Sequence, residues 1–353
     1  MTFVSLQALR ALAALGVMLF HLLPFEAKYL HGASIVPSGF SAGRAGVDLF
    51  FVLSGFLAVW TTRGPASAAA AQRFLLRRVT RIYPTYWLYC IPLLVAAIAA
   101  PVGDGRPDLV ASVLLIPNAA PPLLLVAWTL EFEIYFYLVF ALLIGAGLAR
   151  RGRILALVGW GGAVIAAHVL LAPTRAQALL DALSSPLVFE FLAGCAAAYC
   201  CSSGVPRAVS SVAGIVGCFV LVFGLVWSET LFALPWLRVA VFGIGAALLL
   251  VGCFGEDAAI RRMLPRVIVR IGDASYSLYL SHLFTIGAIG HVLAHVSPAA
   301  LSTPAAHAVA LVTAIVASLL VAELSYRWIE CPLLSFTRHL AKPPVSPRAV
   351  AAE

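Results

Sequence analysis

The stretch Gln7–His21, QALRALAALGVMLFH, decides how the rest of the chain is interpreted. It is an apolar helical pattern with a cation, Arg10, near its start and an imidazole, His21, at its end. Their spacing corresponds to about three helical turns, so both side chains project from nearly the same face, about 16 Å apart along the axis. A charged residue inside a membrane-spanning helix is costly and by default faces the interior of a helix bundle.

Two interpretations fit this helix. In the first, Arg10 is an interfacial anchor that snorkels and His21 merely caps the outer end. In the second, both side chains line a polar passage through the bundle. The helix has no basic cluster before its apolar run, and no small-x-small cleavage site follows before Pro24. We therefore expect it to be retained and not removed as a signal peptide.

The composition points to a membrane protein. The chain has 353 residues, of which 62% are hydrophobic and 11% charged, whereas about 25% of a soluble domain is charged. Apolar runs of about 20 residues recur, as in polytopic α-helical proteins. The predicted spans are 6–23, 46–62, 82–100, 125–148, 153–172, 183–201, 209–227, 234–254, 273–295 and 305–328. We expect one all-α transmembrane domain of about ten helices over 1–340 and a disordered cytoplasmic tail over 341–353.

The distribution of basic residues predicts the orientation. Of the 23 Lys and Arg residues, 17 fall in one alternate set of loops and termini, and only five in the other. Because basic loops stay in the cytoplasm, we expect both termini to be cytoplasmic, with Arg10 toward the cytoplasm and His21 toward the outside. The seven cysteines form no CxxC pair and no zinc spacing, so no metal site is expected.

Several polar residues interrupt the predicted spans. Asp48 opens the second span; it is either stabilised there by the helix dipole or is an outer polar group beside His21. Glu131 and Glu133 are two residues apart in the fourth span and face different sides of the helix. One of them is expected to face the interior beside an arginine or histidine, and Glu131 to lie at the headgroups. His282 in the ninth span is a second interior candidate.

The segment 66–81, ASAAAAQRFLLRRVTR, is amphipathic, with Arg73, Arg77 and Arg81 recurring every four residues. One interpretation is an interfacial helix resting on anionic lipid headgroups. The other is a phosphate clamp, because the planar guanidinium group binds phosphate oxygens bidentately.

Six stretches occur in an order that resembles acyltransferase family 3, the membrane-bound acyltransferases of bacterial surface and exopolysaccharide modification. They are Arg10-x10-His21, GVDLFFVLSGF, RRVTRIYP, WTLEFEIYFY, IGDASYSLYLSH and SYRWIECP. The resemblance covers nearly the whole chain, and the WTLxFExxFY form looks most like the exopolysaccharide acetyltransferase branch. The sequence carries no extra soluble hydrolase-like domain of the kind some relatives append, so the membrane bundle is expected to be the whole enzyme.

The resemblance implies transfer of an acyl group, usually acetyl, from cytoplasmic acetyl-CoA to a hydroxyl of a polysaccharide or lipid-linked sugar. It implies a multi-pass protein of the bacterial inner membrane, surrounded by lipid, with no metal and no nucleic-acid partner. The family's histidine falls on His21, its paired cation on Arg10, its double arginine on Arg78 and Arg81, and its glutamate on Glu133. The predicted substrate- and cofactor-binding residues are Arg77, Arg78, Arg81, Asp48 and His282.

We expect His21 to act as general base, because a neutral imidazole titrates near physiological pH. Glu133, if it faces inward, would orient that ring and stabilise the imidazolium. An acyl-histidine intermediate is the alternative chemistry. Two other functions remain open: a transporter or flippase of a lipid-linked sugar, and an acyltransferase acting on an antibiotic or a lipid. No pair of broken helices recurs in two halves of the chain, which speaks against the transporter.

Overall fold

The computed structural model describes residues 3–62, 64–99, 107–171 and 178–338, and these residues form helices without strands. The predicted tail over 341–353 lies outside the described residues. The first half of the chain contains α1 (Val4–Tyr29), η1 (Ser38–Ala45), α2 (Gly46–Trp60), α3 (Ala68–Ala99), α4 (Leu109–Leu114), η2 (Leu125–Ala127), α5 (Trp128–Gly145), α6 (Arg150–Leu171) and α7 (Ala178–Leu183). The second half contains α8 (Val188–Ser202), α9 (Arg207–Val226), α10 (Ser228–Ala233), α11 (Pro235–Arg238), η4 (Val239–Gly243), α12 (Ile244–Gly255), α13 (Asp257–Met263), α14 (Arg266–Asp273), α15 (Ser275–Leu293), η5 (Pro298–Leu301), α16 (Pro304–Ser325), η6 (Tyr326–Glu330) and α17 (Cys331–Arg338).

The all-α membrane bundle predicted from the sequence is confirmed. Within the described residues, nine helical segments are long and apolar enough to cross a membrane. They correspond to nine of the ten predicted spans. The remaining one, α15, has 19 residues but carries Ser, Tyr and His side chains that lower its hydropathy. Because Ser277, Ser281 and His282 are buried inside the protein, α15 keeps these groups away from lipid.

The arginine-rich segment 66–81 is not a separate interfacial helix. It forms the first half of α3, which continues for 32 residues through Pro84 and Pro92. The predicted third span, 82–100, therefore begins in the middle of a longer helix. The arginines are therefore joined directly to the apolar part of α3, because both belong to one helix.

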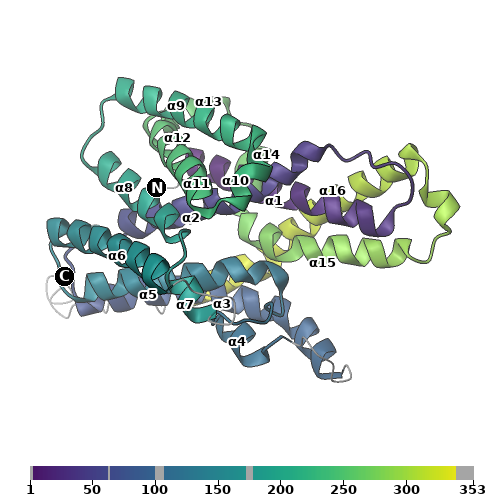
Figure 1. Ribbon diagram of the computed structural model, residues 1–353, viewed down its shortest axis with the longest axis horizontal. Helices are drawn as coiled ribbons and strands as arrows, with labels where there is room; N and C mark the ends of the chain where they lie inside the picture. Colours follow the sequence, from purple (N-terminus) through teal and green to yellow (C-terminus); the bar gives the residue numbers. More distant parts are fainter. Residues whose placement is uncertain (1–2, 63, 100–106, 172–177, 339–353) are drawn as a thin grey trace, which may run out of the picture.

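Helix α1, which carries Arg10 and His21, packs against several other helices. It packs against α2, α14 and α15, and Figure 1 shows its C-terminal part beside α15 and α16 at one end of the molecule. Two glycines allow close approach of the backbones. A Cβ atom on Gly46 would lie 2.2 Å from the carbonyl oxygen of Ala13, and one on Gly272 would lie 2.1 Å from that of Gln7. Small residues at such crossings let membrane helices pack tightly.

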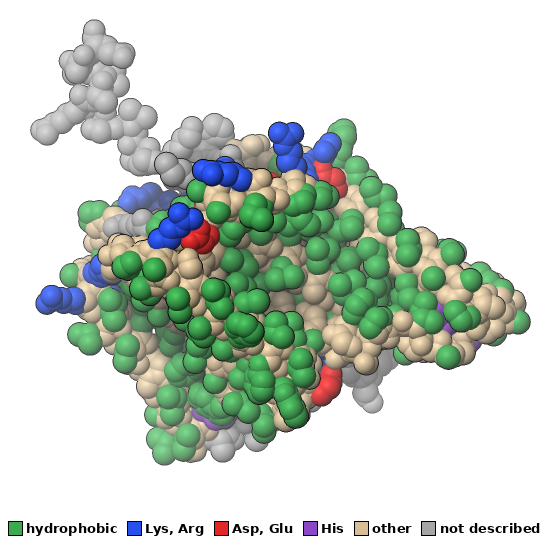
Figure 2. Space-filling view, turned by 90° about the horizontal axis from the view of Figure 1, so that it is seen from above, with side chains coloured by type: hydrophobic (Ala, Val, Ile, Leu, Met, Phe, Trp, Pro, Cys, Tyr) green, Lys and Arg blue, Asp and Glu red, His purple; other side chains and the backbone are tan. Residues whose placement is uncertain are grey.

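The surface agrees with a membrane location. Figure 2 shows hydrophobic side chains over most of the visible face, with the Lys and Arg side chains gathered toward one side. Large apolar residues such as Leu142, Leu170 and Val226 are more than 70% exposed, which suits contact with lipid. The cytoplasmic orientation of both termini stays a prediction.

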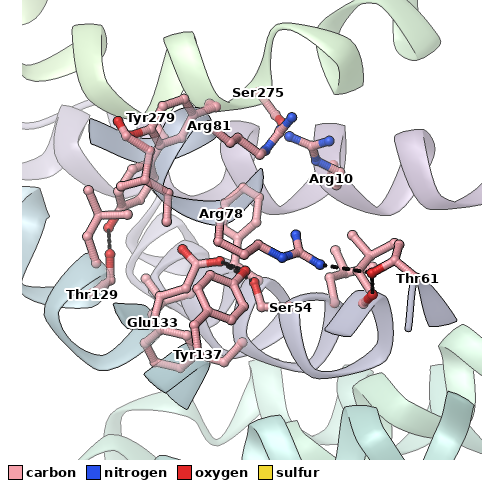
Figure 3. Close-up of a pocket in the computed structure, with 18 residues that line it drawn as sticks. Arg10, Ser54, Thr61, Arg78, Arg81, Thr129, Glu133, Tyr137, Ser275 and Tyr279 are labelled. Atoms are coloured by element: carbon pink, nitrogen blue, oxygen red, sulfur yellow. Dashed lines mark hydrogen bonds between the residues drawn. The ribbon is translucent and has the colours of Figure 1, made fainter. Parts of the chain in front are cut away.

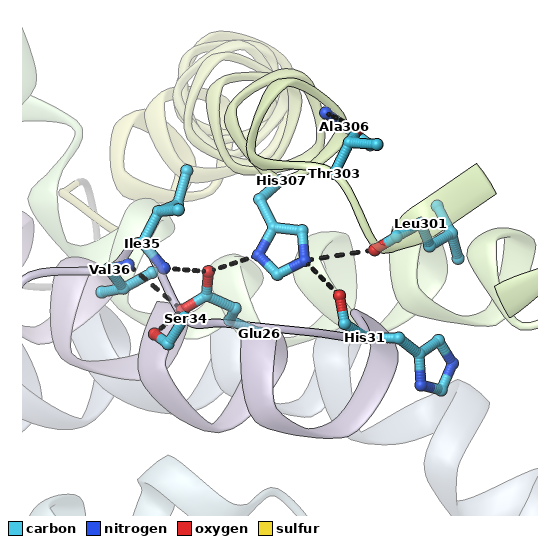
Figure 4. A network of polar contacts seen from close by, with 9 residues as sticks. All are labelled: Glu26, His31, Ser34, Ile35, Val36, Leu301, Thr303, Ala306 and His307. Carbon is cyan, nitrogen blue, oxygen red and sulfur yellow. Dashed lines mark hydrogen bonds and ion pairs between the residues drawn. The ribbon is translucent and has the colours of Figure 1, made fainter. Parts of the chain in front are cut away.

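A buried polar network ties α1 to α16 (Figure 4). The side chains of Glu26 and His307 are 3% and 1% exposed, and His307 Nδ1 lies 2.7 Å from Glu26 Oε1. The Nε2 atom of His307 lies 2.9 Å from the carbonyl oxygen of His31, to which it can only donate. Glu26 also accepts from Ser34 and from the backbone N–H groups of residues 35 and 36. These contacts link Glu26, His307 and the backbone of residues 31, 35 and 36, and so hold the loop after α1 in place.

Replacing His307 with Ala is expected to destabilise the protein by about 3–5 kcal/mol, because it leaves the carboxylate of Glu26 buried without its partner. Thermal unfolding of the detergent-solubilised protein measures this effect. Lys28→Ala, an exposed change on the same helix, serves as the control and is expected to stay within about 0.5 kcal/mol. Equal stability of the two variants would contradict the structural role of the pair.

Candidate active site

A cavity of about 280 Å³ lies between α1, α2, α3, α5 and α15. It follows one face of α2, whose lining residues are Val47, Phe50, Phe51, Leu53, Ser54 and Leu57, and it reaches Thr61 directly after this helix. From Thr61 to Val47 this face extends about 21 Å along the helix axis. Thr61 is exposed whereas Phe51 is buried. The cavity is therefore long and narrow, and it opens at the Thr61 end.

Three guanidinium groups face this cavity: those of Arg10, Arg78 and Arg81. In Figure 3, Arg10 and Arg81 lie beside each other near Ser275, while Arg78 extends toward Thr61, whose hydroxyl is 3.5 Å from its Nη2 atom. Among the residues that the structure describes, none of these three arginines forms an ion pair within 4.0 Å. Three like charges brought together with no carboxylate in direct contact indicate a site for an anionic ligand.

The structure separates the arginines that the sequence grouped together. Arg78 and Arg81 line the cavity, whereas Arg77 does not and its side chain is exposed. One helical residue corresponds to about 100° of rotation, so Arg77 projects from a different face of α3 than Arg78 and Arg81, which are three residues apart. Figure 3 shows the resulting arrangement, in which Arg78 and Arg81 reach inward from α3.

Glu133 is the carboxylate of the cavity. Its Oε1 atom accepts hydrogen bonds from Ser54, at 2.6 Å, and from Tyr137. The expectation that one of the two span-four carboxylates faces the interior therefore holds for Glu133. Its predicted contact with His21 is not found among the described residues. Both of its bonded partners are neutral hydroxyls, so its negative charge partly offsets the three arginines.

The deep end of the cavity is closed by aromatic side chains. The rings of Phe50 and Tyr279 are 5.8 Å apart, and the two hydroxyl oxygens of Tyr279 and Thr129 are 2.7 Å apart. The Tyr279 hydroxyl also donates to the carbonyl oxygen of Val126, at 3.0 Å. Both Tyr279 and Thr129 are 6% exposed. These contacts hold the tyrosine ring across the end of the cavity.

His21 and His282 do not line the cavity, but they lie next to its closed end. The ring of His282 is 6.1 Å from that of Tyr279, and its Nε2 atom is 3.2 Å from Nδ1 of His21. Gly46, the first residue of α2, lies against Ala13 and Val17 of α1. His21 follows Val17 by four residues, so it lies about one helical turn beyond the start of α2. His21 is partly exposed and His282 is buried. Arg10 thus faces the cavity directly, whereas His21 lies outside its lining and reaches the lining residue Tyr279 through His282.

Asp48 has a partner that the sequence did not suggest. Arg238 of α11 donates from Nε at 2.8 Å and from Nη2 at 3.1 Å to the two oxygens of its carboxylate. Asp48 is fully buried and does not line the cavity. A carboxylate engaged by a bidentate arginine fixes the packing of α2 against α11. A role for Asp48 in substrate binding stays a prediction.

Sequence reasoning missed several residues that shape the site. Tyr137 follows Glu133 by four residues, so the helical i,i+4 rule would have found this pair. Thr129 and Tyr279 are 150 residues apart and meet only through tertiary packing. The same holds for the pair Asp48 and Arg238, 190 residues apart. No local pattern in a single sequence predicts such contacts.

Fold and site together define a multi-pass membrane protein with an elongated, arginine-lined cavity beside a pair of histidines. A sequence profile described as an acyltransferase domain matches residues 3–323. The chain therefore belongs to acyltransferase family 3, and the protein is an acyltransferase.

Three relatives illustrate the range of the family. The chain is 30% identical over 319 residues to the exopolysaccharide production protein ExoZ of Rhizobium meliloti, covering 86% of this chain and 93% of ExoZ. It is 28% identical over 318 residues to the acyltransferase MdmB of Streptomyces mycarofaciens, covering 80% and 78%. It is 25% identical over 368 residues to the peptidoglycan O-acetyltransferase OatA of Listeria monocytogenes, covering 93% of this chain and 55% of OatA. No solved structure gives a significant match.

Proposed function

We propose that the protein transfers an acetyl group from cytoplasmic acetyl-CoA to a hydroxyl group of a surface or exopolysaccharide sugar, in the bacterial inner membrane. The observation that carries the proposal is the cavity itself, where three unpaired arginines lie at the open part and two histidines lie beyond the closed end. Similarity to ExoZ and OatA supports a polysaccharide acceptor.

The size and charge of the cavity suit part of acetyl-CoA. Pockets that bind small molecules measure about 300–1,000 Å³, and this cavity, at about 280 Å³, is just below that range, so it takes only part of a molecule as long as acetyl-CoA. The acetyl-pantetheine arm, which is thin and uncharged, would lie along α2. The phosphates would remain near the mouth, where Arg78 and Arg81 bind their oxygens and Arg10 adds a third positive charge.

His21 would activate the acceptor. Its imidazole takes the proton of the sugar hydroxyl while the oxygen attacks the thioester carbonyl. A new C–O bond forms, the C–S bond breaks, and the proton passes from the imidazolium to the departing thiolate of CoA. Because His21 is partly exposed, the acceptor would approach from the side of the histidine that is remote from the arginines.

The thioester would have to pass the Phe50–Tyr279 pair to reach His21. Tyr279→Ala is therefore expected to join the cavity to the histidines and to increase hydrolysis of acetyl-CoA several-fold when no sugar is present, since water then reaches the thioester. Release of free thiol measures this rate. Tyr279→Phe keeps the ring and removes only its hydrogen bonds, so it is expected to hydrolyse far less. Identical rates for the two variants would exclude the ring as a barrier.

Membranes incubated with acetyl-labelled acetyl-CoA test the proposal against a transporter of lipid-linked sugar. Transfer of label to saccharide, lost in His21→Ala, is the expected result. Movement of sugar across the membrane without transfer of label would contradict the proposed function and favour the transporter.

A further inference from the structure

Two histidines from helices far apart in the sequence meet beside the proposed site of chemistry. His21 comes from α1 and His282 from α15, and their ring centroids are 4.9 Å apart with an angle of 53° between the planes. Close contacts of the backbone hold the two helices together. A Cβ atom on Gly290 of α15 would lie 2.3 Å from the ring of Tyr29 on α1. Such packing sets the separation of the two imidazoles without depending on their hydrogen bond.

Backbone carbonyls determine where the ring protons are. The Nδ1 atom of His21 lies 2.8 Å from the carbonyl oxygen of Val17, and Nδ1 of His282 lies 3.0 Å from that of Leu278. A carbonyl oxygen only accepts, so both Nδ1 atoms carry hydrogen. In the neutral rings each Nε2 then has a free electron pair. The Nε2 atom of His282, 3.2 Å from Nδ1 of His21, is therefore a second acceptor for the same N–H group.

We propose that His282 is a positioning residue for His21. This inference rests on the proposed function, in which His21 is the general base. It accepts the Nδ1–H of His21, fixes the rotation of that ring, and leaves Nε2 of His21 as the atom that takes the proton. When the hydroxyl proton arrives at Nε2, the positive charge spreads over the ring, and the contact with Nε2 of His282 becomes a charge-assisted hydrogen bond. This hydrogen bond stabilises the imidazolium more than the neutral ring of His21. It therefore lowers the free-energy barrier of acetyl transfer and leaves the binding of acetyl-CoA unchanged.

This inference also revises the role expected for Glu133. A carboxylate commonly orients a catalytic histidine, but Glu133 is bonded to Ser54 and Tyr137 in the cavity. A neutral imidazole takes the orienting place instead. Since His282 is 1% exposed, its side of the contact is buried, although His21 is partly exposed.

Two amide substitutions at position 282 test the proposal, because Asn places its amide near the Nδ1 position and Gln reaches the Nε2 position. His282→Asn is expected to lower kcat for acetyl transfer by about 10- to 100-fold, with KM for acetyl-CoA unchanged. His282→Gln, which restores an acceptor for His21, is expected to recover most of the rate. His291→Asn is the control on the same helix, since His291 is exposed, and it is expected to keep full activity.

Equal kcat values for the Gln and Asn variants, or a change confined to KM, would overturn the assignment. Thermal unfolding of both variants, in the same detergent, is expected to show similar midpoints, so that a difference in kcat reports the lost acceptor. His21→Ala, measured in the same assay, separates this inference from the proposed function. Loss of activity in His21→Ala combined with full activity in His282→Asn refutes the positioning role alone. Full activity in His21→Ala would refute both the positioning role of His282 and the role of His21 as general base.

Discussion

Replacing His21 with Ala is expected to reduce the rate of acetyl transfer by about 10²–10⁴-fold, the range that a general base contributes. A sugar hydroxyl is a weak nucleophile unless its proton is removed as it attacks. Within the described residues, the nearest alternative base is His282, whose Nδ1–H faces a carbonyl and whose Nε2 faces His21. In the wild type its electron pair is engaged by His21, and in the variant it stays buried, with His282 1% exposed, so we expect it to replace the base poorly. The rate of transfer from acetyl-CoA to saccharide in isolated membranes measures the effect.

The His21→Ala variant must also be shown to fold. His21 is partly exposed, but its ring is the hydrogen-bond partner of the buried His282. The substitution is therefore expected to cost about 1–3 kcal/mol of stability, and expression and thermal unfolding are measured to show that the variant still folds. His291→Ala, on an exposed face of α15, is the matched control and is expected to retain the wild-type rate. Activity of His21→Ala comparable to that of the control would exclude His21 as the base.

Removing Arg78 or Arg81 is expected to weaken binding of coenzyme A by about 10- to 100-fold each. A hydrogen bond to a charged group contributes about 1.5–3 kcal/mol, and each arginine offers such bonds to a phosphate. Calorimetric titration of the purified protein measures the dissociation constant. Lysine keeps the charge but not the planar fork, so Arg81→Lys is expected to fall between the wild type and Arg81→Ala.

Two comparisons make this prediction specific. Arg77 is adjacent in sequence but exposed and outside the cavity, so Arg77→Ala is expected to bind coenzyme A nearly as well as the wild type. Pantetheine lacks phosphates, so its binding should not respond to either Arg78→Ala or Arg81→Ala. Equal losses for coenzyme A and pantetheine would mean that these arginines shape the cavity and do not recognise phosphate.

The sequence predicted the parts of the site that depend on helical periodicity. Arg10 and His21 were placed on one face of the first span, and both now lie along the same side of the bundle, although only Arg10 faces the cavity. Arg78, Arg81 and Glu133 are instead singled out by the resemblance to the family, because periodicity alone points to Arg73, Arg77 and Arg81 and leaves open which of Glu131 and Glu133 faces inward. Only the placement of Arg10 and His21 on one face uses distances within a single helix, where 3.6 residues per turn fix the geometry.

The remaining features depend on contacts between helices. His21 lies outside the cavity lining, and the lining residue Tyr279 is held by Thr129, from another helix. The partner of His21 is a histidine 261 residues away, and the partner of Asp48 is Arg238. Hydrophobic spacing indicates which face of a helix is buried, but it does not say which helix covers that face. The apolar pattern of residues 273–295 likewise predicts a membrane span. It does not say which helices cover the serine and histidine side chains of α15, although that cover is what makes them tolerable in a membrane.

Mass spectrometry of the surface polysaccharide tests the central claim most directly. Polysaccharide from cells that produce the wild-type protein is compared with polysaccharide from cells that produce His21→Ala at the same level. The account predicts a sugar repeat heavier by one acetyl group in the wild-type sample and the unmodified repeat in the variant. Identical masses in the two samples, with both proteins folded in the membrane, would contradict it.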